Sequence, residues 1–489
     1  MLWEFRNTGI TPSGGFTFGV RVVYIEPHDG RETALSVRRL RPPVTQSTAT
    51  LVGVDDTDSR ERGMCTTYLA ARLGERIEAT GGEVRRQLLV RLNPAVPHKT
   101  RGNAALAVHT DVDPSLALEL AREELSGLAI ADDPGTSPGA VVADVEPGAI
   151  PEDVATFARA AMREFHDLSE AIDLIERHGW KHEGFRGETA TATGADDVVG
   201  RGRIGALAAV GAWRAFDDWT AEHVAYREFD RCGTPREVDV DSVFDAADWG
   251  YPTVWDTVDR GEGEAVCVPN APGPILFGIR GDDPAACRAV ADRIDAEPVE
   301  RTATFLTNQG TDAHLAPGEI GSLRDGAGYR VEGTVASPPE TRRGGHVFFE
   351  LARPGDSGME SPPTVTCAAF EPTKRFRELV RALRPGDQIT ACGEHTDGTL
   401  KLEKFAVREL VETERVNPTC PDCGRSMSSA GQNQGYRCRD CGTAAERKRP
   451  KPIDRALEAG WYEVPPCARR HVAKPLVRGG FDADVHPER

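Results

Sequence analysis

The chain has 489 residues and a formal net charge of −18, with 77 acidic against 59 basic side chains. It is too long for one hydrophobic core, so three or four domains are expected. No apolar run approaches the roughly 20 residues that a bilayer span needs, which predicts a soluble protein without a membrane partner.

The charge is unevenly placed. Residues 415–489 hold 14 basic and 9 acidic side chains, so the end of the chain is basic while the remainder is strongly acidic. Only eight of the basic residues are lysines, a balance that suggests a cytoplasm where high salt screens surface charge. We expect a cytoplasmic protein, and its global acidity is only a weak argument against an RNA partner.

The first 49 residues lack sustained periodicity, and the run from Arg38 to Pro43 is typical of a linker. We interpret this stretch as an extension, either disordered or the product of a mis-assigned start site.

A strand–loop–helix unit follows. A β-branched strand over residues 50–54 ends at Asp55, Asp56 and Asp58, and an apolar i, i+3, i+4 pattern begins a helix near Thr66. Neighbouring carboxylates repel one another unless a cation lies between them, and Mg²⁺ prefers such oxygen ligands and accompanies nucleotide phosphates. A polar turn or a helix cap is the alternative.

The next two strands, 88–92 and 104–109, enclose a loop of different character. Lys99 and Arg101 supply cations, and Gly102 lets backbone amides approach a ligand, as a triphosphate requires. The spacing is not that of a Walker motif, and an ordinary solvated loop is the alternative. Thr66 and Thr67 lie at a helix N-terminus, where phosphate is favoured, although threonine is also a routine N-cap.

Helices are predicted over residues 114–128 and 151–178, the second without Gly or Pro in its interior. The glycine cluster at 200–205 begins another unit, in which strand-like and helical segments alternate to about residue 305. This unit includes a strand at 274–281 and a helix at 283–296, and it fits a small α+β layer.

After the polar block 307–314, short strands with frequent Gly and Pro dominate. Their number matches the five strands of an OB-fold barrel, which commonly binds nucleic acid. The predicted strands are 329–335, 346–351, 364–370, 388–393 and 400–410.

Two cysteine pairs near the C-terminus predict a structural zinc site. Cys420 and Cys423 form the first CxxC, Cys438 and Cys441 form the second, and 14 residues separate the pairs. This is close to the separation of about 15 to 20 residues in a zinc ribbon. Two disulfides are the alternative, which a reducing cytoplasm disfavours.

An ordered series of motifs resembles the archaeal tRNA 2-agmatinylcytidine synthetase family over nearly everything after residue 49. The motifs are VDDTDS at 54–59, GMCTTYLA at 63–70, RLNP at 91–94, KTRGN at 99–103, GRIGAL at 202–207, TNQGTDAH at 307–314, the paired CxxC and VPPCARRH at 464–471. The family pattern does not require the 49 N-terminal residues.

The resemblance implies a mixed α/β and α+β multidomain protein. Its expected parts are an extension at 1–49, an ATP-binding kinase-like α/β domain at 50–199, a ferredoxin-like domain at 200–305, an OB-fold barrel at 306–412, and a zinc ribbon with a basic tail at 413–489.

The implied activity is attachment of agmatine to C2 of the wobble cytidine in the isoleucine tRNA with anticodon CAU, which changes decoding from AUG to AUA. ATP phosphorylates the C2 oxygen so that it leaves as phosphate, and ATP ends as AMP and phosphate. Asp55, Asp56 and Asp58 are the implied magnesium and proton-handling carboxylates, and Thr66 is a residue that takes up a phosphoryl group. The implied nucleotide-binding residues are Lys99, Thr100, Arg101, Gly102, Asn103 and Arg203.

The tRNA and agmatine are the expected partners, and ATP, Mg²⁺ and structural Zn²⁺ the expected cofactors. Agmatine carries a guanidinium, which needs a carboxylate, and must attack through a neutral amine, which needs a base. Cations of the ribbon and of the segment Arg469, Arg470, His471 and Lys474 are expected to form a tRNA-binding surface. A non-catalytic RNA or single-stranded DNA binder, or a ligase using another amine, are the alternatives.

Overall fold

The computed structural model describes residues 49–59, 61–97, 99, 102–185, 199–355, 362–470 and 473–489. The N-terminal extension, apart from Ala49, therefore lies outside the described residues. So do three residues singled out in the sequence, Thr100, Arg101 and His471.

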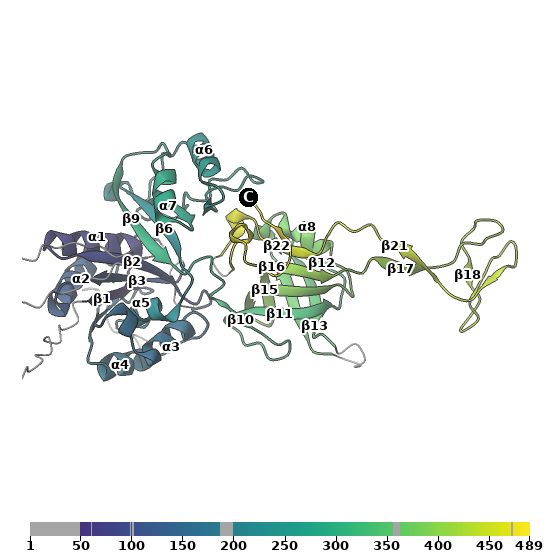
Figure 1. Cartoon of the computed structure of the whole chain (residues 1–489), viewed down its shortest axis with the longest axis horizontal. Coiled ribbons are helices and arrows are strands. Elements are labelled where there is room, and N and C mark those ends of the chain that lie inside the picture. Colours follow the sequence, from purple (N-terminus) through teal and green to yellow (C-terminus); the bar gives the residue numbers. More distant parts are fainter. Residues whose placement is uncertain are drawn as a thin grey trace, which may run out of the picture. The chain divides into compact units, whose positions relative to one another are not determined.

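One nine-stranded sheet runs through the first two thirds of the chain, in the order β5-β4-β1-β3-β2-β9-β6-β8-β7 (Figure 1). Its strands are β1 Thr50–Asp55, β2 Val84–Arg91, β3 Ala104–Thr110, β4 Gly139–Asp144, β5 Lys181–Gly184, β6 Thr220–Arg227, β7 Val254–Trp255, β8 Ile275–Gly281 and β9 Val299–Thr307. The parallel pairing of β2 with β9 joins the first five strands to the other four.

Helices cover both faces of this sheet. They are α1 Thr66–Ala79, α2 Pro114–Leu128, α3 Glu152–Ala160, α4 Leu168–Arg177, α5 Arg203–Ala215, α6 Val240–Gly250 and α7 Pro284–Ala291. In β1, Leu51 packs in the core with α3, α4 and α5, whereas Val52 and Val54 pack in the core with α1 and α2. A strand buried on both faces is apolar throughout, which explains the unbroken run at residues 50–54.

The predicted helix over 151–178 is wrong, because the chain leaves the helix between α3 and α4. The carbonyl of Ala161 accepts a hydrogen bond from the Asn93 backbone N–H (3.0 Å), and the Arg163 guanidinium donates to the Ala313 carbonyl (2.7 Å). These tertiary hydrogen bonds replace helical ones. The predicted helix over 283–296 likewise ends early, at Ala291, because Ala296 forms a β-bridge with Val238.

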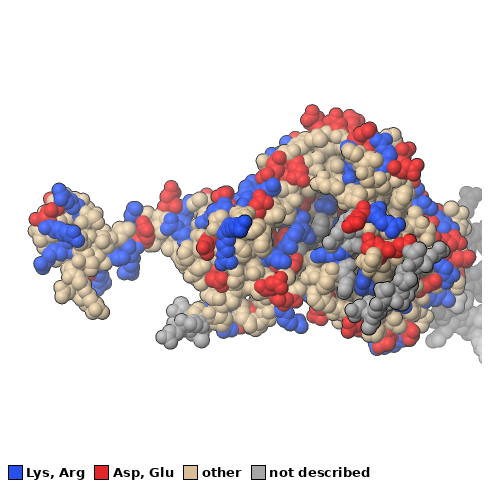
Figure 2. Space-filling model, turned by 180° about the vertical axis from the view of Figure 1, so that it is seen from behind, with Lys and Arg blue, Asp and Glu red and all other residues tan. Residues whose placement is uncertain are grey.

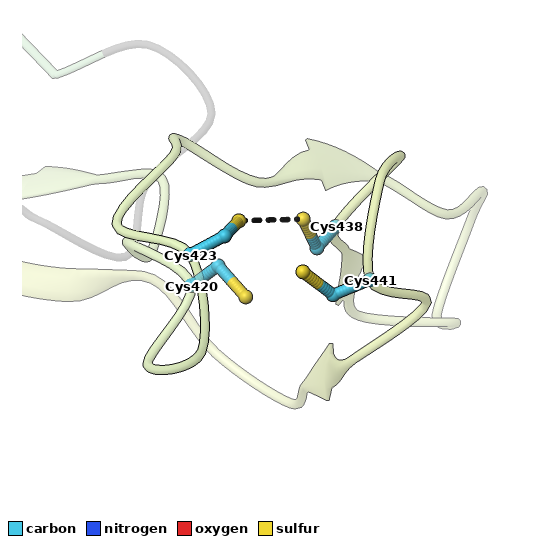
Figure 3. Close-up of side chains that lie close together, drawn as sticks. All are labelled: Cys420, Cys423, Cys438 and Cys441. Atoms are coloured by element: carbon cyan, nitrogen blue, oxygen red, sulfur yellow. Dashed lines mark hydrogen bonds between the residues drawn. The ribbon is translucent and has the colours of Figure 1, made fainter.

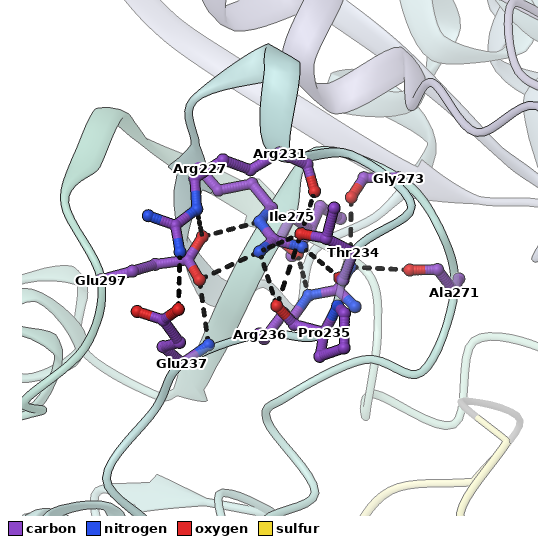
Figure 4. Close-up of polar contacts among 10 residues, drawn as sticks. All are labelled: Arg227, Arg231, Thr234, Pro235, Arg236, Glu237, Ala271, Gly273, Ile275 and Glu297. Carbon is purple, nitrogen blue, oxygen red and sulfur yellow. Dashed lines mark hydrogen bonds and ion pairs between the residues drawn. The ribbon is translucent and has the colours of Figure 1, made fainter.

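A buried ion pair anchors the irregular segment after β6. Arg227 and Glu297 are both fully buried and form two hydrogen bonds of 2.7 and 2.9 Å (Figure 4). Arg227 also donates to the carbonyls of Thr234 and Pro235, and Arg236 donates to the carbonyls of three residues in the facing loop. The network thus supplies hydrogen-bond donors to backbone carbonyls of this irregular region.

A closed five-stranded barrel follows, and all five of its predicted strands are confirmed. They pair in the closed order β11-β13-β14-β16-β15, and α8 lies between β14 and β15 in sequence. The elements are β10 Leu315–Pro317, β11 Ala327–Val335, β12 Glu340–Thr341, β13 Val347–Ala352, β14 Thr364–Ala369, α8 Phe376–Arg381, β15 Gln388–Thr396 and β16 Thr399–Glu409.

The chain then makes a small four-cysteine module and returns to the barrel. The module contains β17 Thr413–Val416, β18 Ser428–Ser429, β19 Tyr436–Arg437, β20 Ala444–Ala445 and β21 Arg449–Pro452. After it, β22 (Gly460–Glu463) pairs antiparallel with β16, and β23 (Val485–His486) pairs parallel with β22. Within the described part of the chain, no helix is long and apolar enough to cross a membrane.

Candidate active site and metal centre

The acidic loop begins where β1 ends. Asp55 is the last residue of the strand, and its Oδ1 accepts a hydrogen bond of 2.7 Å from the Asp56 backbone N–H. Asp56 adopts a left-handed backbone with φ of +62°, a conformation that few residues other than glycine tolerate. This turn ends the strand, in which successive side chains would point to opposite faces of the sheet.

Burial raises the pKa of both carboxyls. For Asp55, burial and then the negative charge of Asp56 raise the pKa well above its ordinary value. For Asp56, burial raises the pKa, and the Arg201 guanidinium partly offsets the effect. The loop therefore holds negative charge in surroundings that disfavour it, a common property of sites that bind cations or move protons.

The N-terminal end of α5 lies directly against this loop. A Cβ on Gly205 would lie 1.9 Å from Asp55 Oδ2, and a Cβ on Gly202 would lie 2.6 Å from the Asp55 carbonyl oxygen. Only glycine permits such an approach. The glycine cluster of the sequence therefore serves to bring the start of α5 against the end of β1.

One cavity of about 350 Å³ gathers most of the predicted site. Its lining includes six of the predicted residues, from loops far apart in the sequence: Asp55, Asp56, Asp58, Lys99, Gly102 and Asn103. Asn103 also donates a hydrogen bond of 2.9 Å to the Asn93 carbonyl, which fixes the loop that follows β2. Carboxylates and cations thus line the same space, as binding of a metal-bound polyphosphate requires.

Two predicted residues do not line this cavity. Thr66 is buried, and its hydroxyl oxygen accepts a hydrogen bond of 3.0 Å from the Thr57 hydroxyl. Arg203 donates to the carbonyls of Gly200 (2.9 Å) and Val199 (2.8 Å), so its guanidinium holds the loop before α5.

Arg201 lines the cavity, as was predicted from the sequence for Arg203 instead. Its guanidinium donates to Asp56 Oδ2 (2.7 Å) and to the Gly135 carbonyl (2.8 Å). The sequence shows two arginines in one glycine cluster and no pattern that tells which of them faces the ligand.

The break between α3 and α4 was not predicted from the sequence. Glu164, Phe165, His166 and Asp167 line the cavity from this segment. A signal was present, because two acidic residues flank a phenylalanine and a histidine there, within an apparently continuous helix. Periodicity alone cannot show that this turn faces a ligand.

A second cavity of about 310 Å³ adjoins the first and shares Leu92, Lys99, Gly102 and Asn103 with it. Its other lining residues are Arg91 at the end of β2, His314 between β9 and β10, Glu394 of the barrel, and Arg469 and Arg470 of the C-terminal segment. Lys99 and Asn103 therefore lie between the two cavities and line both of them.

Arg469 is not a surface residue, contrary to the sequence-based expectation. Its side chain is 5% exposed and forms ion pairs with Asp256 and Glu463. Arg470 is 41% exposed, but Glu403 and Glu394 pair with it. These arginines hold the C-terminal segment in place, and their charges are largely neutralised by carboxylates.

The four cysteines converge, as their spacing predicted. Their sulfur atoms all lie within 4.8 Å of one another, and Cys423 and Cys438 lie 3.5 Å apart (Figure 3). A zinc ion about 2.3 Å from each sulfur needs edges of about 3.8 Å, so the quartet fits tetrahedral zinc. No other group of this kind occurs among the described residues, and the three aspartates of the acidic loop do not form one.

Both halves of the cysteine module have the same local structure. The N–H of Gly424 donates to the Cys420 carbonyl (2.9 Å), and the N–H of Gly442 donates to the Cys438 carbonyl (3.0 Å). Each glycine has a positive φ, of +72° and +74°. Figure 2 shows Lys and Arg over the surface of this module. The six cations predicted to bind tRNA here are all exposed: Arg437, Arg439, Arg447, Lys448, Arg449 and Lys451.

Three family models match separate parts of the chain. Residues 51–112 match the TiaS TCKD domain, residues 200–314 the TiaS FLD domain, and residues 417–457 the TiaS C-terminal zinc ribbon domain. The isoleucine-tRNA 2-agmatinylcytidine synthetase TiaS from Haloquadratum walsbyi is 56% identical over 473 residues, which cover 90% of this chain and 100% of the relative. This chain belongs to the TiaS family.

Solved TiaS structures resemble the whole described fold. The crystal structure of a complex of TiaS with isoleucine tRNA and ATP matches with a TM-score of 0.78 and 40% identity. That of a complex of TiaS with isoleucine tRNA, AMPCPP and agmatine matches with a TM-score of 0.75 and 38% identity. Each comparison covers 90% of this chain and 100% of the other.

Proposed function

We propose that this protein attaches agmatine to C2 of the wobble cytidine in the CAU-anticodon isoleucine tRNA, in a reaction that consumes ATP. The observation that carries the proposal is the single cavity in which Asp55, Asp56 and Asp58 meet Lys99 and Asn103. Membership of the TiaS family supports it, together with the ATP, agmatine and isoleucine tRNA present in the related complexes.

The reaction needs activation because the C2 oxygen of cytosine is an amide-like carbonyl and a poor leaving group. Transfer of the ATP γ-phosphoryl group to this oxygen makes it leave as phosphate when the amine attacks C2, and this transfer leaves ADP. For ATP to end as AMP, the β-phosphoryl group must be transferred as well, to water or to Thr66, and be released as a second phosphate. The transferred group has a loose transition state, so positioning and charge neutralisation provide most of the catalysis.

We assign the phosphates to the part of the cavity lined by Lys99, Gly102 and Asn103, with Thr100 and Arg101 from the same loop. Arg201 is an additional cation for this part, and it replaces Arg203 as the candidate. Mg²⁺ would be held by the oxygen atoms of Asp55, Asp56 or Asp58. Because Mg²⁺ usually takes one or two carboxylates together with phosphates and water, a preformed cluster of three is not needed.

Thr66 remains the proposed phosphoryl acceptor. Its hydroxyl is hydrogen-bonded to the Thr57 hydroxyl, and neither residue lines the cavity. A phosphoryl group could reach Thr66 only if this hydrogen bond opened. The proposal therefore implies a movement of the loop that precedes α1.

We infer a kinase-like part at 50–199, a ferredoxin-like part at 200–305, an OB-fold at 306–412 and the ribbon with the C-terminal segment at 413–489. The barrel supports the third assignment, since five strands in the order 1-2-3-5-4-1, with a helix after the third, correspond to the OB-fold. The sheet is continuous across the first boundary, because β2 pairs with β9, and α5 also packs on β1, β3 and β4.

The exposed cations of the ribbon are the proposed contacts with the remainder of the tRNA, in a cytoplasmic enzyme. The target base would have to leave the anticodon stack to enter the cavity, at a cost of roughly a few kcal/mol that is smaller in an open loop.

The decisive experiment incubates the protein with ATP, labelled agmatine and the CAU-anticodon transcript. We expect label in the RNA and a nucleoside mass that corresponds to cytidine with agmatine in place of the C2 oxygen. A transcript with a wobble uridine is the control. Tight tRNA binding without label would support a non-catalytic binder, and label only from a different amine would support another ligase.

A further inference from the structure

His166 lines the cavity and carries a buried polar atom that no described residue satisfies. Its side chain is only 7% exposed, it lines the cavity, and its Nε2 is buried without a hydrogen-bond partner among the described residues. Buried polar atoms are nearly always hydrogen-bonded, so one that faces a cavity indicates a place for a ligand atom.

The other ring nitrogen determines what Nε2 can do. Nδ1 lies 2.9 Å from Oε2 of Glu170, one turn along α4. Glu170 is 53% exposed, and an ionised carboxylate only accepts hydrogen bonds, so Nδ1 carries the proton. In the neutral ring, Nε2 is then left with a free lone pair.

The ring is also held in place. Phe157 of α3 packs against it with ring centroids 4.5 Å apart. The break between α3 and α4 brings the ring to the cavity. In a continuous helix, the helical periodicity would set the direction of each of these side chains instead. A carboxylate that orients an imidazole beside a reaction space, with the second ring nitrogen left unpartnered, is the arrangement of a general base.

The surroundings of His166 favour a cationic ligand. Glu164 and Asp167 lie beside it on the cavity wall, and the side chain of Asp167 does not cap α4. Phe165 is 57% exposed on the same wall and offers an aromatic face to a cation. The charged groups across the cavity are Lys99, Arg201 and the acidic loop.

We propose that His166, oriented by Glu170, is the base that deprotonates the attacking amine of agmatine. This inference rests on the proposed function and adds a catalytic residue to it. An alkyl amine with a pKa near that of lysine, about 10.4, is an ammonium at neutral pH and has no lone pair for attack. A base within the cavity removes this barrier.

The step balances as follows. One ammonium proton passes to Nε2 of His166, and the lone pair that it leaves forms the bond to C2 of the phosphorylated cytosine. The C2–O bond breaks, its electron pair leaves with the phosphate, and the phosphate takes the second proton. The imidazolium then returns its proton to water.

The test compares H166Q with the unaltered enzyme under saturating ATP, agmatine and tRNA. We expect the rate constant of agmatine attachment at pH 7.5 to fall about 100-fold or more, within the usual contribution of a general base. The KM for ATP and the Kd for tRNA should stay within about twofold, because the role is confined to the amine step.

The pH dependence separates a base from a structural residue. In H166Q the rate should rise about tenfold per pH unit between about pH 7 and 9, because solution alone supplies the free amine. The rate of the unaltered enzyme should rise less steeply with pH, because a base within the cavity accepts the ammonium proton. A rate like that of the unaltered enzyme, or a parallel pH profile, would overturn the proposal.

His178 provides a matched control. It also lies beside a carboxylate, with Nε2 3.0 Å from Asp153, but it does not line the cavity. H178Q should therefore behave like the unaltered enzyme. If H166Q does not fold, E170Q carries the test: a loss of about tenfold is expected, and an unchanged rate contradicts the proposal. An unaltered enzyme that attaches no agmatine would refute the proposed function instead.

Discussion

Arg201 and Asp56 form an ion pair of 2.7 Å between the loop before α5 and the loop after β1. The Asp56 side chain is 14% exposed and its backbone is held at a positive φ, so the pair lies in a withdrawn and rigid part of the cavity. Arg201 also donates to the Gly135 carbonyl, which fixes the guanidinium from two sides. A cation fixed in this way is preorganised for a negatively charged ligand.

Replacing Arg201 with Met should lower ATP cleavage about 100-fold or more, the usual effect of losing one preorganised group. Single-turnover cleavage of labelled ATP in the presence of tRNA measures the effect. R214M is a suitable control, because Arg214 lies at the other end of α5 and pairs with Glu152 away from the cavity. Equal rates of ATP cleavage by R201M and R214M would show that Arg201 only joins the two loops and does not act on ATP.

Replacing Asp55 with Asn should abolish turnover and yet stabilise the fold. Burial holds the pKa of Asp55 well above its value of 3.8 in the unfolded chain, so the native state keeps a proton that the unfolded state loses. Stability contributed by this group therefore falls as pH rises between the two values, so the penalty is larger at neutral pH than below pH 3.8.

The gain in thermal midpoint of D55N should accordingly be greatest near pH 7 and vanish below about pH 3.8. Thermal unfolding of both proteins across this range measures it. Asp144 ends the neighbouring strand β4 but is exposed, so D144N should show no comparable gain. A D55N midpoint at pH 7 below that of the unaltered protein would contradict the argument.

The elements that the sequence predicted correctly depend on local signals. The strand before Asp55, the helix from Thr66 and the five barrel strands each follow from apolar spacing, and the cysteine quartet follows from CxxC geometry. Residues 151–178 were predicted wrongly, since the hydrogen bonds after α3 join Ala161 and Arg163 to distant segments of the chain, at Asn93 and Ala313.

The choice among chemically equal residues was also beyond the sequence. Arg201 and Arg203 are two residues apart, yet one guanidinium faces the cavity while the other binds backbone carbonyls. Arg469 was expected at the surface because arginine usually is, but Asp256 and Glu463 allow it to be buried. Such outcomes depend on partners that only the folded chain brings together.

Replacing Glu297 with Gln should destabilise the fold by about 3–5 kcal/mol, because it leaves the buried Arg227 without its countercharge. The double variant R227M/E297L should lose less, since it removes both charges. Urea unfolding of the three proteins measures the difference. Glu237 pairs with Arg231 nearby but is exposed, so E237Q should change stability little. A double variant no more stable than E297Q would contradict this account.

Replacing Cys423 with Ser should release zinc and unfold the cysteine module while the barrel and the nine-stranded sheet remain intact. The module is small, and the only large residues buried with the cysteines are Met427 and, in part, Tyr436, so metal binding has to supply most of its folding free energy. Zinc content should fall from one ion per chain to none. Protease cleavage should appear within residues 417–457 alone, because the rest of the chain has cores of its own.

The same variant should weaken tRNA binding about tenfold or more, because the exposed cations of the module lose their fixed arrangement. Fluorescence anisotropy of labelled tRNA at several salt concentrations measures the Kd. C232S is the matched control, since Cys232 is a half-buried free thiol outside the quartet. A C423S protein that has lost its zinc but retains the tRNA affinity of C232S would show that the module contributes no essential contact. If the affinity falls and its salt dependence becomes shallower, the decrease in slope instead gives the number of phosphate contacts that the module makes.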